Sequence, residues 1–368
     1  MRLRFERRAE PSLLMLVVTP IASVLLTMLL GAALFQALGY NGFAAVKEIF
    51  FTPILASYKW QDVATKAAPL ILIGLGLAVG NQAKVWNIGA EGQYVIGALS
   101  GAGVAYATQT AEGFWIIPLM ILAGIAGGMA WAAIPAFLKI HFRVNEILSS
   151  LMLTYVGLQV LSYLITGPWK DPKGHNFPQT PPFTDAQLLP HTLPGTPIPP
   201  SLVVAVVLAL VFWLLTARSV FGYQIRVIGA APHAARYGGF DGPRTVCLAM
   251  LIGGGMAGLA GILEASSQSG QINLGFPSGY GFTGIIVAFL GRLHPIGVVI
   301  AGIVLAISYV GGQVAQSAVH VPNATAGIFQ AMMLFFLLAS DILVRYRLRI
   351  VRPQTAIAAA VAAVGGPA

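Results

Sequence analysis

Polar residues interrupt a glycine-rich apolar stretch of the sequence at residues 74–103. Asn87, Glu91 and Gln93 separate its two apolar runs, and Trp86 directly precedes them. Non-helical backbone at membrane depth persists only where it is buried in protein or lines a water-filled cavity. A helix interrupted here would present backbone dipoles and these side chains to a path for a polar solute. The alternative is an ordinary turn, in which Asn87 caps the next helix and Glu91 favours its N-terminal dipole.

A second interrupted stretch covers residues 268–281 and includes Tyr280, and a short apolar run follows it from Phe282. Its tripeptide Asn273-Leu274-Gly275 is similar to Asn87-Ile88-Gly89 of the first stretch. Five apolar runs separate the two tripeptides, which would place them on opposite faces of a membrane, as an inverted repeat requires. A chance match of three residues is the alternative.

Further polar candidates lie inside apolar runs. Asn145 and Glu146 open the run at 144–166. An acid entering a membrane helix is more often a functional or paired group than an accident, although at a helix start it also stabilises the dipole. Gln159 of the same run and Glu264 are further candidates for a polar pocket.

Several kinds of chemistry are excluded. No lysine follows a glycine, so the chain has no G-x-x-x-x-G-K-[ST] cradle for the phosphates of ATP. The six histidines show no H-E-x-x-H spacing, and no G-x-S-x-G motif is present. The single cysteine, Cys247, rules out disulfide frameworks and cysteine-rich metal sites. We therefore expect no catalytic residue, no metal site and no cofactor on this chain, and a protein that is not itself an enzyme.

The elements that must position these residues follow from composition. Of 368 residues, 57% are hydrophobic and 9% are charged, against roughly 25% charged in a soluble domain. At about 20 residues per span, the fold class is an all-α, polytopic integral membrane protein with about ten transmembrane helices, one or two of them broken or short. The predicted spans are 12–38, 63–82, 92–110, 114–138, 144–166, 201–217, 245–267, 280–291, 295–317 and 323–343.

The basic residues predict the orientation. With the N-terminus in the cytoplasm and each span reversing the side, every arginine falls on the cytoplasmic side, as the positive-inside rule requires. The span 280–291 is too short to cross comfortably, but removing it would put Arg292 and the C-terminal arginines outside. We therefore predict a broken helix there and cytoplasmic N- and C-termini. The lysines assigned to the outer side are Lys47, Lys59, Lys66, Lys170 and Lys173.

Two long loops complete the single transmembrane domain predicted for residues 1–353; the tail 354–368 is expected to be disordered. Residues 167–200, the proline-rich loop, are assigned to the outer face, either as a seat for a partner or as an ordered connector. Residues 218–244 form the longest cytoplasmic loop.

Within the loop 218–244, Pro232 suits the start of a helix and the glycine pair 238–239 suits its end, which predicts a short helix over 232–237. Its alanines leave a slim surface for a groove on a soluble partner, and arginines at its edges could pair with carboxylates. The alternative is a basic loop resting on anionic lipid headgroups. The residues predicted to form this docking surface are Arg226, Gly229, Pro232, Ala234, Ala235, Arg236, Tyr237, Gly238 and Gly239.

Five segments, in order between about residues 60 and 345, carry a family resemblance: VWNIGAEGQYVIGA, VNEILSSLMLTY, GPWKDP, GYQIRVIGAAPHAARYGG and GFTGIIVAFLG. Together they resemble the permease subunits of bacterial ABC importers of the sugar, nucleoside and branched-chain amino acid superfamily, and the nucleoside type most. The resemblance implies a multi-pass protein of the bacterial cytoplasmic (inner) membrane that translocates a nucleoside or simple sugar.

The partners follow from the same resemblance. It implies a cytoplasmic ABC ATPase, often with two fused nucleotide-binding domains, that holds ATP and Mg. It also implies a second, non-identical permease subunit and an extracytoplasmic substrate-binding protein, with membrane lipid around the chain and no nucleic acid. ATP binding to that ATPase would rock the permease between inward-open and outward-open states.

The resemblance can be carried onto particular residues. The stretch 226–239 matches the loop that docks on the ATPase, so we call residues 218–244 the coupling loop. Residues 87–93 and 145–146 match signature segments. Thr154 stands where such permeases often have Asn, which puts an amide-dependent substrate contact there in doubt.

Two alternatives belong to other classes. An ion-coupled secondary transporter of a small polar solute would need ionisable groups deep in the spans, and Glu264 is the best candidate. A channel-forming or structural membrane subunit would be indifferent to ATP.

Overall fold

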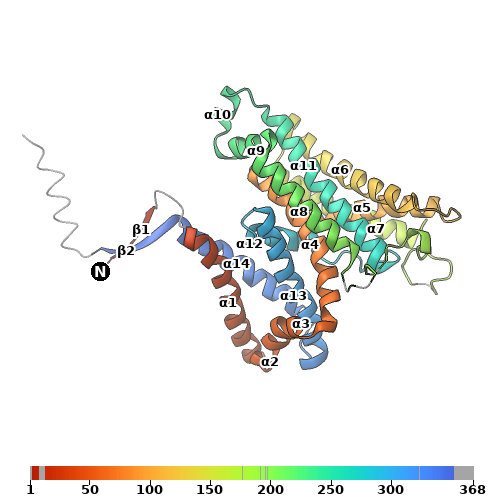
Figure 1. Ribbon diagram of the computed structural model, residues 1–368, viewed down its shortest axis with the longest axis horizontal. Helices are drawn as coiled ribbons and strands as arrows, with labels where there is room; N and C mark the ends of the chain where they lie inside the picture. The colour runs from red at the N-terminus through yellow and green to blue at the C-terminus, as the bar shows by residue number, and fades with distance from the viewer. Residues whose placement is uncertain are drawn as a thin grey trace, which may run out of the picture. The chain divides into compact units, whose positions relative to one another are not determined.

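The computed structural model describes residues 2–7, 13–175, 177–190, 192–194, 196, 198–322 and 324–351; the tail predicted at 354–368 lies outside them. The chain divides into two compact units, formed by the described residues of Met1–Gly42 with Gly327–Ala368, and of Phe43–Ala326. We call them the terminal unit and the central unit. Both are built from helices, as Figure 1 shows for each.

A helix occupies each of the ten predicted apolar runs. The first and last, α1 and α14, belong mainly to the terminal unit and the others to the central unit. Among the described residues, seven helices are long and apolar enough to cross a membrane. The helices on the predicted runs are α1 (Leu13–Ala37), α4 (Trp60–Gln82), α5 (Ala90–Ala107), α6 (Ile116–Phe142), α7 (Glu146–Thr166), α8 (Pro200–Arg218), α11 (Gly242–Glu264), α12 (Tyr280–Leu290), α13 (Pro295–Val319) and α14 (Thr325–Arg345).

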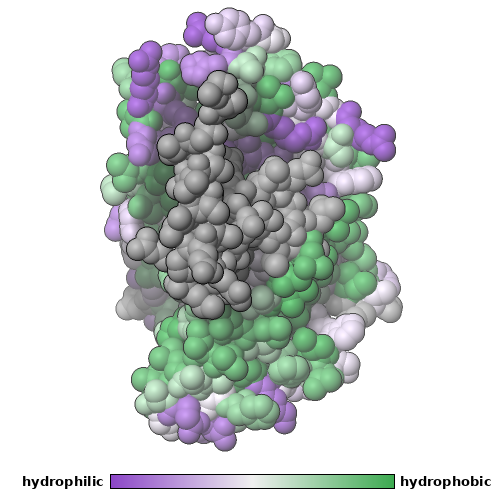
Figure 2. Space-filling model, turned by 90° about the vertical axis from the view of Figure 1, so that its left-hand side faces the viewer, coloured by the Kyte–Doolittle hydropathy of each residue, from purple (hydrophilic) through white to green (hydrophobic). Residues whose placement is uncertain are grey.

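The central unit is built around α4 and α11. The most apolar window of α4 is 89% buried and that of α11 is 72% buried, whereas those of α6 and α7 are 28% and 22% buried. The outer helices therefore turn apolar side chains outward. Hydrophobic residues also cover much of the face that Figure 2 shows. A surface of this kind requires a lipid or protein environment, so the chain is a multi-pass membrane protein.

Glycines allow α11 to approach two neighbouring helices closely. A Cβ atom on Gly258 of α11 would collide with the backbone oxygen of Gly124 in α6, and one on Gly97 of α5 would collide with Gly258. Gly254 meets Gly128 in the same way. In membranes, where water does not drive helices together, such small-residue contacts are a main source of packing energy.

Three parts of the structure differ from the predictions. The chain is not entirely helical, because β1 (Arg2–Arg7) pairs antiparallel with β2 (Tyr346–Val351), with Arg4 opposite Arg349. Each strand alternates polar and apolar residues, which is the period of a strand.

The second difference lies in the coupling loop, which contains a second helix, α9 (Val220–Ala230).

The third difference lies between α1 and α4, where an outer loop was expected. This segment folds as α2 (Gly42–Val46), a π-helical turn (Lys47–Phe51), α3 (Thr52–Leu55) and a 3-10 turn (Ser57–Lys59). Ile49 and Phe50 are buried, and Gly311 of α13 allows the backbone of Ile49 to approach. These elements are too short to give an apolar run of membrane length. The other short elements are α10 (Pro232–Tyr237), a 3-10 turn at Asp185–Gln187 and a π-helical turn at Ala265–Ser269.

Candidate functional site

The first interruption, residues 83–89, begins where α4 ends. Lys84 adopts the left-handed conformation with φ 59°, the backbone N–H of Val85 donates to the carbonyl of Gly80 over 2.9 Å, and that of Lys84 donates to Asn81 over 3.1 Å. This is a Schellman termination with lysine in the position that glycine usually holds. The segment then runs past Gly253, near the middle of α11, before α5 starts. Ala83, Val85, Asn87 and Gly89 are buried while Lys84 and Trp86 are exposed, so one side of this irregular segment packs into the helix bundle.

Asn87 and Gln93 form a reciprocal amide pair within this buried segment. The Asn87 amide nitrogen donates to Oε1 of Gln93 over 2.8 Å, and Gln93 Nε2 donates back to Oδ1 of Asn87 over 3.1 Å. Oδ1 of Asn87 also accepts from the backbone N–H of Gly89, and the N–H of Ile88 donates to Ser150 Oγ on α7. Both amide side chains are buried, at 6% and 1% exposure. Their hydrogen bonds satisfy each other and fix the turn that starts α5.

Glu91 joins the two interrupted regions. Its carboxylate accepts hydrogen bonds from the backbone N–H groups of Gly279, over 2.9 Å, and Gly281, over 2.5 Å. These N–H groups belong to the first turn of α12, which has no intrahelical acceptor for them. A negative charge is also favourable at that end of the helix dipole. A Cβ atom on Gly281 would collide with the Glu91 backbone, so glycine permits the close approach of α5 and α12.

An aromatic cluster covers the junction of α5 and α12. The rings of Tyr94 and Phe276 stack with centroids 5.1 Å apart, and the ring of Tyr280 meets Tyr94 edge-on at 5.9 Å. The hydroxyl of Tyr309, on α13, donates to the backbone carbonyl of Ser278 over 3.0 Å. Tyr94 and Tyr280 are 0% and 1% exposed, and the Tyr94 hydroxyl is buried with no hydrogen-bond partner among the described residues.

A partly buried ion pair lies beside this aromatic cluster. Nζ of Lys66, on α4, is 3.2 Å from Oε1 of Glu264, on α11, with side chains 24% and 7% exposed. The same Nζ atom lies 5.4 Å from the centroid of the Tyr280 ring, within cation–π range. The charge pattern had assigned Lys66 to a loop on the outer side, but Lys66 lies within α4. Its ammonium group pairs with Glu264, the best candidate for ion coupling.

The second interruption, residues 270–279, is held by the proline-rich loop. The backbone N–H of Thr180 donates to the carbonyl of Ile272 over 2.9 Å, and that of Phe183 to Gly270 over 2.7 Å. Gln179 and Asn273 form an isolated antiparallel bridge. Asn273 is exposed, outside the buried cluster. The described part of the loop is therefore ordered against the second interruption.

The other predicted residues have contacts of their own. Asn145 caps α7 by accepting from the N–H of Ile147, Glu146 pairs with Lys139 of α6, and Gln159 is exposed on α7. Trp86 and Phe282 are each 40% exposed. Thr154 is fully buried beside Gly92 and donates its hydroxyl hydrogen to the carbonyl of Ser150.

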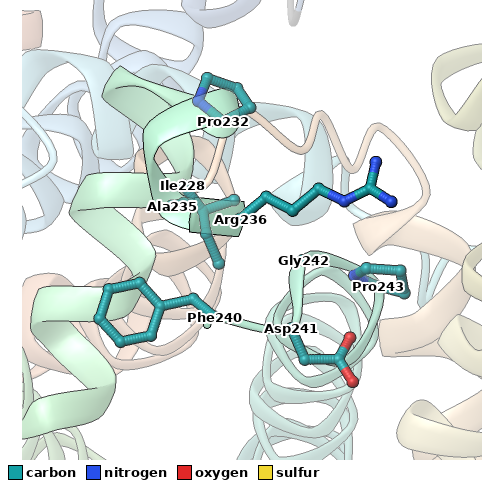
Figure 3. A pocket seen from close by; sticks show the side chains of 8 residues that line it. All are labelled: Ile228, Pro232, Ala235, Arg236, Phe240, Asp241, Gly242 and Pro243. Atoms are coloured by element: carbon teal, nitrogen blue, oxygen red, sulfur yellow. The ribbon is translucent and has the colours of Figure 1, made fainter. Parts of the chain in front are cut away.

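The coupling loop contains a groove of about 510 Å³ (Figure 3). The helix predicted at 232–237 is present as α10, with Pro232 in its first turn and Gly239 at φ 78° after its end. Ala235 is buried, while Arg236 is exposed and extends away from Phe240 across the groove (Figure 3). The residues lining the groove are Ile228, Pro232, Ala235, Arg236, Phe240, Asp241, Gly242 and Pro243.

The two helices of the coupling loop differ in exposure. In α9, Gly222, Ile225 and Ile228 are buried, and the Arg226 guanidinium donates to the carbonyl of Thr216 at the end of α8. Arg226 therefore ties the loop to the bundle through a contact of its own. In α10, by contrast, the side chains of Ala234, Arg236 and Tyr237 are exposed, as are the two glycines 238 and 239. The exposed part of the predicted docking surface is thus concentrated on α10.

Sequence reasoning missed several contributors to the junction. Tyr94, Phe276 and Tyr309 carry no polar pattern that separates them from lipid-facing aromatics. Lys66 lies in the first part of its helix and was counted as a topology signal. Lys66 would have been identified only if its contact with Glu264 on another helix had been known. Spacing in the sequence does not reveal such a contact.

Interrupted segments that meet inside a multi-pass helix bundle are a feature of many membrane transporters. Comparison with known families agrees: residues 60–338 match the family described as branched-chain amino acid transport system / permease component. The match covers most of the chain, and the chain belongs to this family. No solved structure matches it.

Curated relatives narrow the class to ABC transporter permeases. The chain is 35% identical to the glucose ABC transporter permease protein TsgB13 of Haloferax volcanii, over 95% of this chain and 94% of that protein. It is 28% identical to the guanosine ABC transporter permease protein NupP of Bacillus subtilis, over 87% and 92%. It is 27% identical to NupQ, another guanosine ABC transporter permease protein of that bacterium, over 63% and 74%. The chain is accordingly an ABC transporter permease subunit.

Proposed function

We propose that this permease imports a nucleoside or a simple sugar, and that ATP hydrolysis takes place on a separate ATPase. The substrate class is supported by relatives named for glucose and for guanosine. The observation that carries the proposal is the meeting of the two interruptions, where Glu91, the first turn of α12 and the aromatic cluster converge. Aromatic faces beside hydrogen-bonding groups suit a ring that carries hydroxyls.

The translocation path is proposed to run beside this junction. Asn87, Glu91 and Gln93 would then shape the path from within, because their polar atoms are hydrogen-bonded to one another or to the backbone N–H groups at the start of α12. The ring of Tyr280, which packs against Tyr94, would line the path beside them. Opening the path requires the two interruptions to separate or shift together. Residues Trp86, Asn145, Glu146, Thr154, Gln159, Asn273 and Phe282 remain predicted path residues.

The coupling loop is proposed as the docking site for the cytoplasmic ATPase. Its support is the exposed α10, with the groove beside it and the cation of Arg236 at its edge. We further propose a second permease subunit as partner, supported by the resemblance of the chain to both NupP and NupQ. An extracytoplasmic binding protein would deliver the substrate.

The proposed topology has ten crossings in one permease domain, residues 1–353, within the cytoplasmic membrane. In this topology the broken helix that contains α12 makes one of the ten crossings, although α12 itself has only 11 residues, and α5 crosses despite the polar Glu91 and Gln93 in its first turns. The antiparallel pairing of β1 with β2 supports termini on the same side of the membrane, as an even number of crossings requires.

The test is to copurify the complex from its native host, reconstitute it in vesicles and measure uptake of labelled guanosine and labelled glucose. We expect uptake of one of them to depend on ATP and on the copurified ATPase. Arg236→Glu should abolish this uptake while membrane insertion remains normal, because it reverses the charge on the docking surface. The exposed Lys173→Glu in the proline-rich loop is the matched charge reversal and should preserve ATPase copurification.

Uptake driven by an ion gradient without ATPase subunits would contradict the proposal and favour the secondary transporter. The pairing of Glu264 with Lys66 weighs against that alternative, because a buried carboxylate that already has a cation is a poor carrier of a coupling ion.

A further inference from the structure

The end of α4 is enclosed by two other parts of the central unit. On one side lies α9 of the coupling loop, where a Cβ atom on Gly229 would collide with the backbone oxygen of Gln82. Glycine at position 229 therefore lets α9 touch the last turn of α4 through backbone alone. A displacement of α9 towards α4 would press directly on the Gln82 peptide group.

On the other side, the Gln82 side chain reaches the turn between α12 and α13. Its Nε2 donates to the backbone carbonyl of Leu293 over 2.7 Å, and the two residues are 211 positions apart in the sequence. Arg292 and Leu293 both have left-handed backbones, with φ of 55° and 56°. Such conformations are uncommon for residues other than glycine and persist only where the surroundings hold them. The Gln82 amide is one of the groups that hold this turn.

The turn at Leu293 lies at one end of α12, and Glu91 holds the other end. The helix has only 11 residues, so a shift of one end is transmitted to the other as a rigid-body movement. Gln82 thus touches the coupling loop through its backbone and α12 through its side chain. The remaining amide oxygen, Oε1, is buried without a hydrogen-bond partner among the described residues.

We infer that Gln82 is a positioning residue that transmits movement of the coupling loop to α12, and through α12 to the junction with Glu91. The inference rests on the proposed function, because it assumes that an ATPase moves the coupling loop. It adds a specific route, from Gly229 to Gln82 to Leu293, between the docking surface and the second interruption. If Gln82 had only a structural role, it would stabilise the turn at Leu293, and replacing it would leave the response to ATP unchanged.

The test measures movement of the second interruption in the reconstituted complex. In a Cys247→Ser background, spin labels are attached at Leu274→Cys and Phe114→Cys, whose side chains are 45% and 92% exposed. The distance distribution between the labels is recorded with and without ATP. With Gln82 present, we expect ATP to shift the distribution. Gln82→Met keeps the length of the side chain but removes the donor, and it should reduce the shifted population by about fivefold, the scale of one hydrogen bond.

Gly229→Ala should reduce the ATP-shifted population to the same extent, because its added methyl group collides with the backbone carbonyl of Gln82 and disturbs the contact between α9 and α4. Gly103→Ala is the matched control, because the nearest atom to its added methyl lies at 3.5 Å, on Trp169. Gln82→His, which retains a donor, should recover part of the shift. An unchanged shift in both Gln82→Met and Gly229→Ala, or no ATP-dependent shift in the parent complex, would overturn the inference. Failure of any ATPase to copurify would instead count against the proposed function.

Discussion

Glu91 caps a helix to which it does not belong. The sequence places it in the first turn of α5, where local dipole stabilisation is the simplest role, but its carboxylate accepts from the first turn of α12. The residue type was informative, since a buried acid in a membrane protein is expected to have a partner. The partner itself was beyond reach of the sequence, because 188 positions separate Glu91 from Gly279. The sequence could therefore predict a polar site but not its hydrogen bonds.

The buried pair between Lys66 and Glu264 gives a residue-scale prediction. Lys66→Met leaves the Glu264 carboxylate buried without its cation, so it should lower the free energy of unfolding by about 3 kcal/mol. Adding Glu264→Leu removes that penalty and should restore most of the loss. The measurement is the denaturation of the detergent-purified variants, followed by tryptophan fluorescence.

Lys59→Met is the control for this pair. Lys59 is 3.0 Å from Asp62, but their side chains are 28% and 52% exposed. Exposed pairs contribute about 0–1 kcal/mol, so this variant should remain close to the parent. Equal losses from Lys59→Met and Lys66→Met would mean that burial does not distinguish the two pairs.

At the scale of elements, α11 contacts α5 and α6 through glycines, and α4 is surrounded by other helices. The apolar runs predicted the helices well, with α4 ending at Gln82 as expected, because membrane-length hydrophobicity is a local property. Which glycines face each other is a tertiary property, and the sequence shows only their abundance. The same limit explains why the second helix of the coupling loop, α9, was missed. Its buried residues Gly222, Ile225 and Ile228 recur every three residues, and this weak signal lay within a segment treated as a loop.

Substituting Gly258 tests this packing. Gly258→Val places two methyl groups against the backbone of Gly124, so α6 and α11 must separate. We expect a loss of about 1–3 kcal/mol in stability, together with a lower yield of monodisperse protein in size-exclusion chromatography. Gly103→Val in α5 is the matched variant, with its nearest neighbour at 3.5 Å, and should keep the parental yield. Similar yields from both variants would argue against close packing at Gly258.

At the scale of the whole chain, the sequence predicted a membrane protein of many spans, and the family comparison makes it an ABC transporter permease. The charge pattern predicted the orientation but could not predict β1 and β2, because their pairing joins segments at opposite ends of the sequence. Each strand shows the alternating pattern, but two short alternating segments identify no partner. The pairing, when considered with the charges, gives a topology that can be tested in cells.

Cysteine labelling provides that test. In a Cys247→Ser background, Lys173→Cys in the proline-rich loop should react with a membrane-impermeant maleimide in intact cells. Tyr237→Cys, whose side chain is 95% exposed in α10, should react only after permeabilisation. The cysteine-free parent measures background labelling. The opposite result at these two positions would reverse the proposed orientation.

The pairing of β1 with β2 also constrains how the chain is made. In the order of synthesis β1 precedes every helix and β2 follows α14, so β1 has no access to this partner until all of these helices have been made. Bringing β1 and β2 together closes a loop that contains all the helices, which has an entropy cost. The hydrogen bonds and side-chain contacts between the two strands must offset this cost. A nascent chain arrested before Tyr346 would contain every helix through α14, but its β1 would have no β2 to pair with. The pairing of β1 with β2 therefore has to follow the synthesis of all the helices between them.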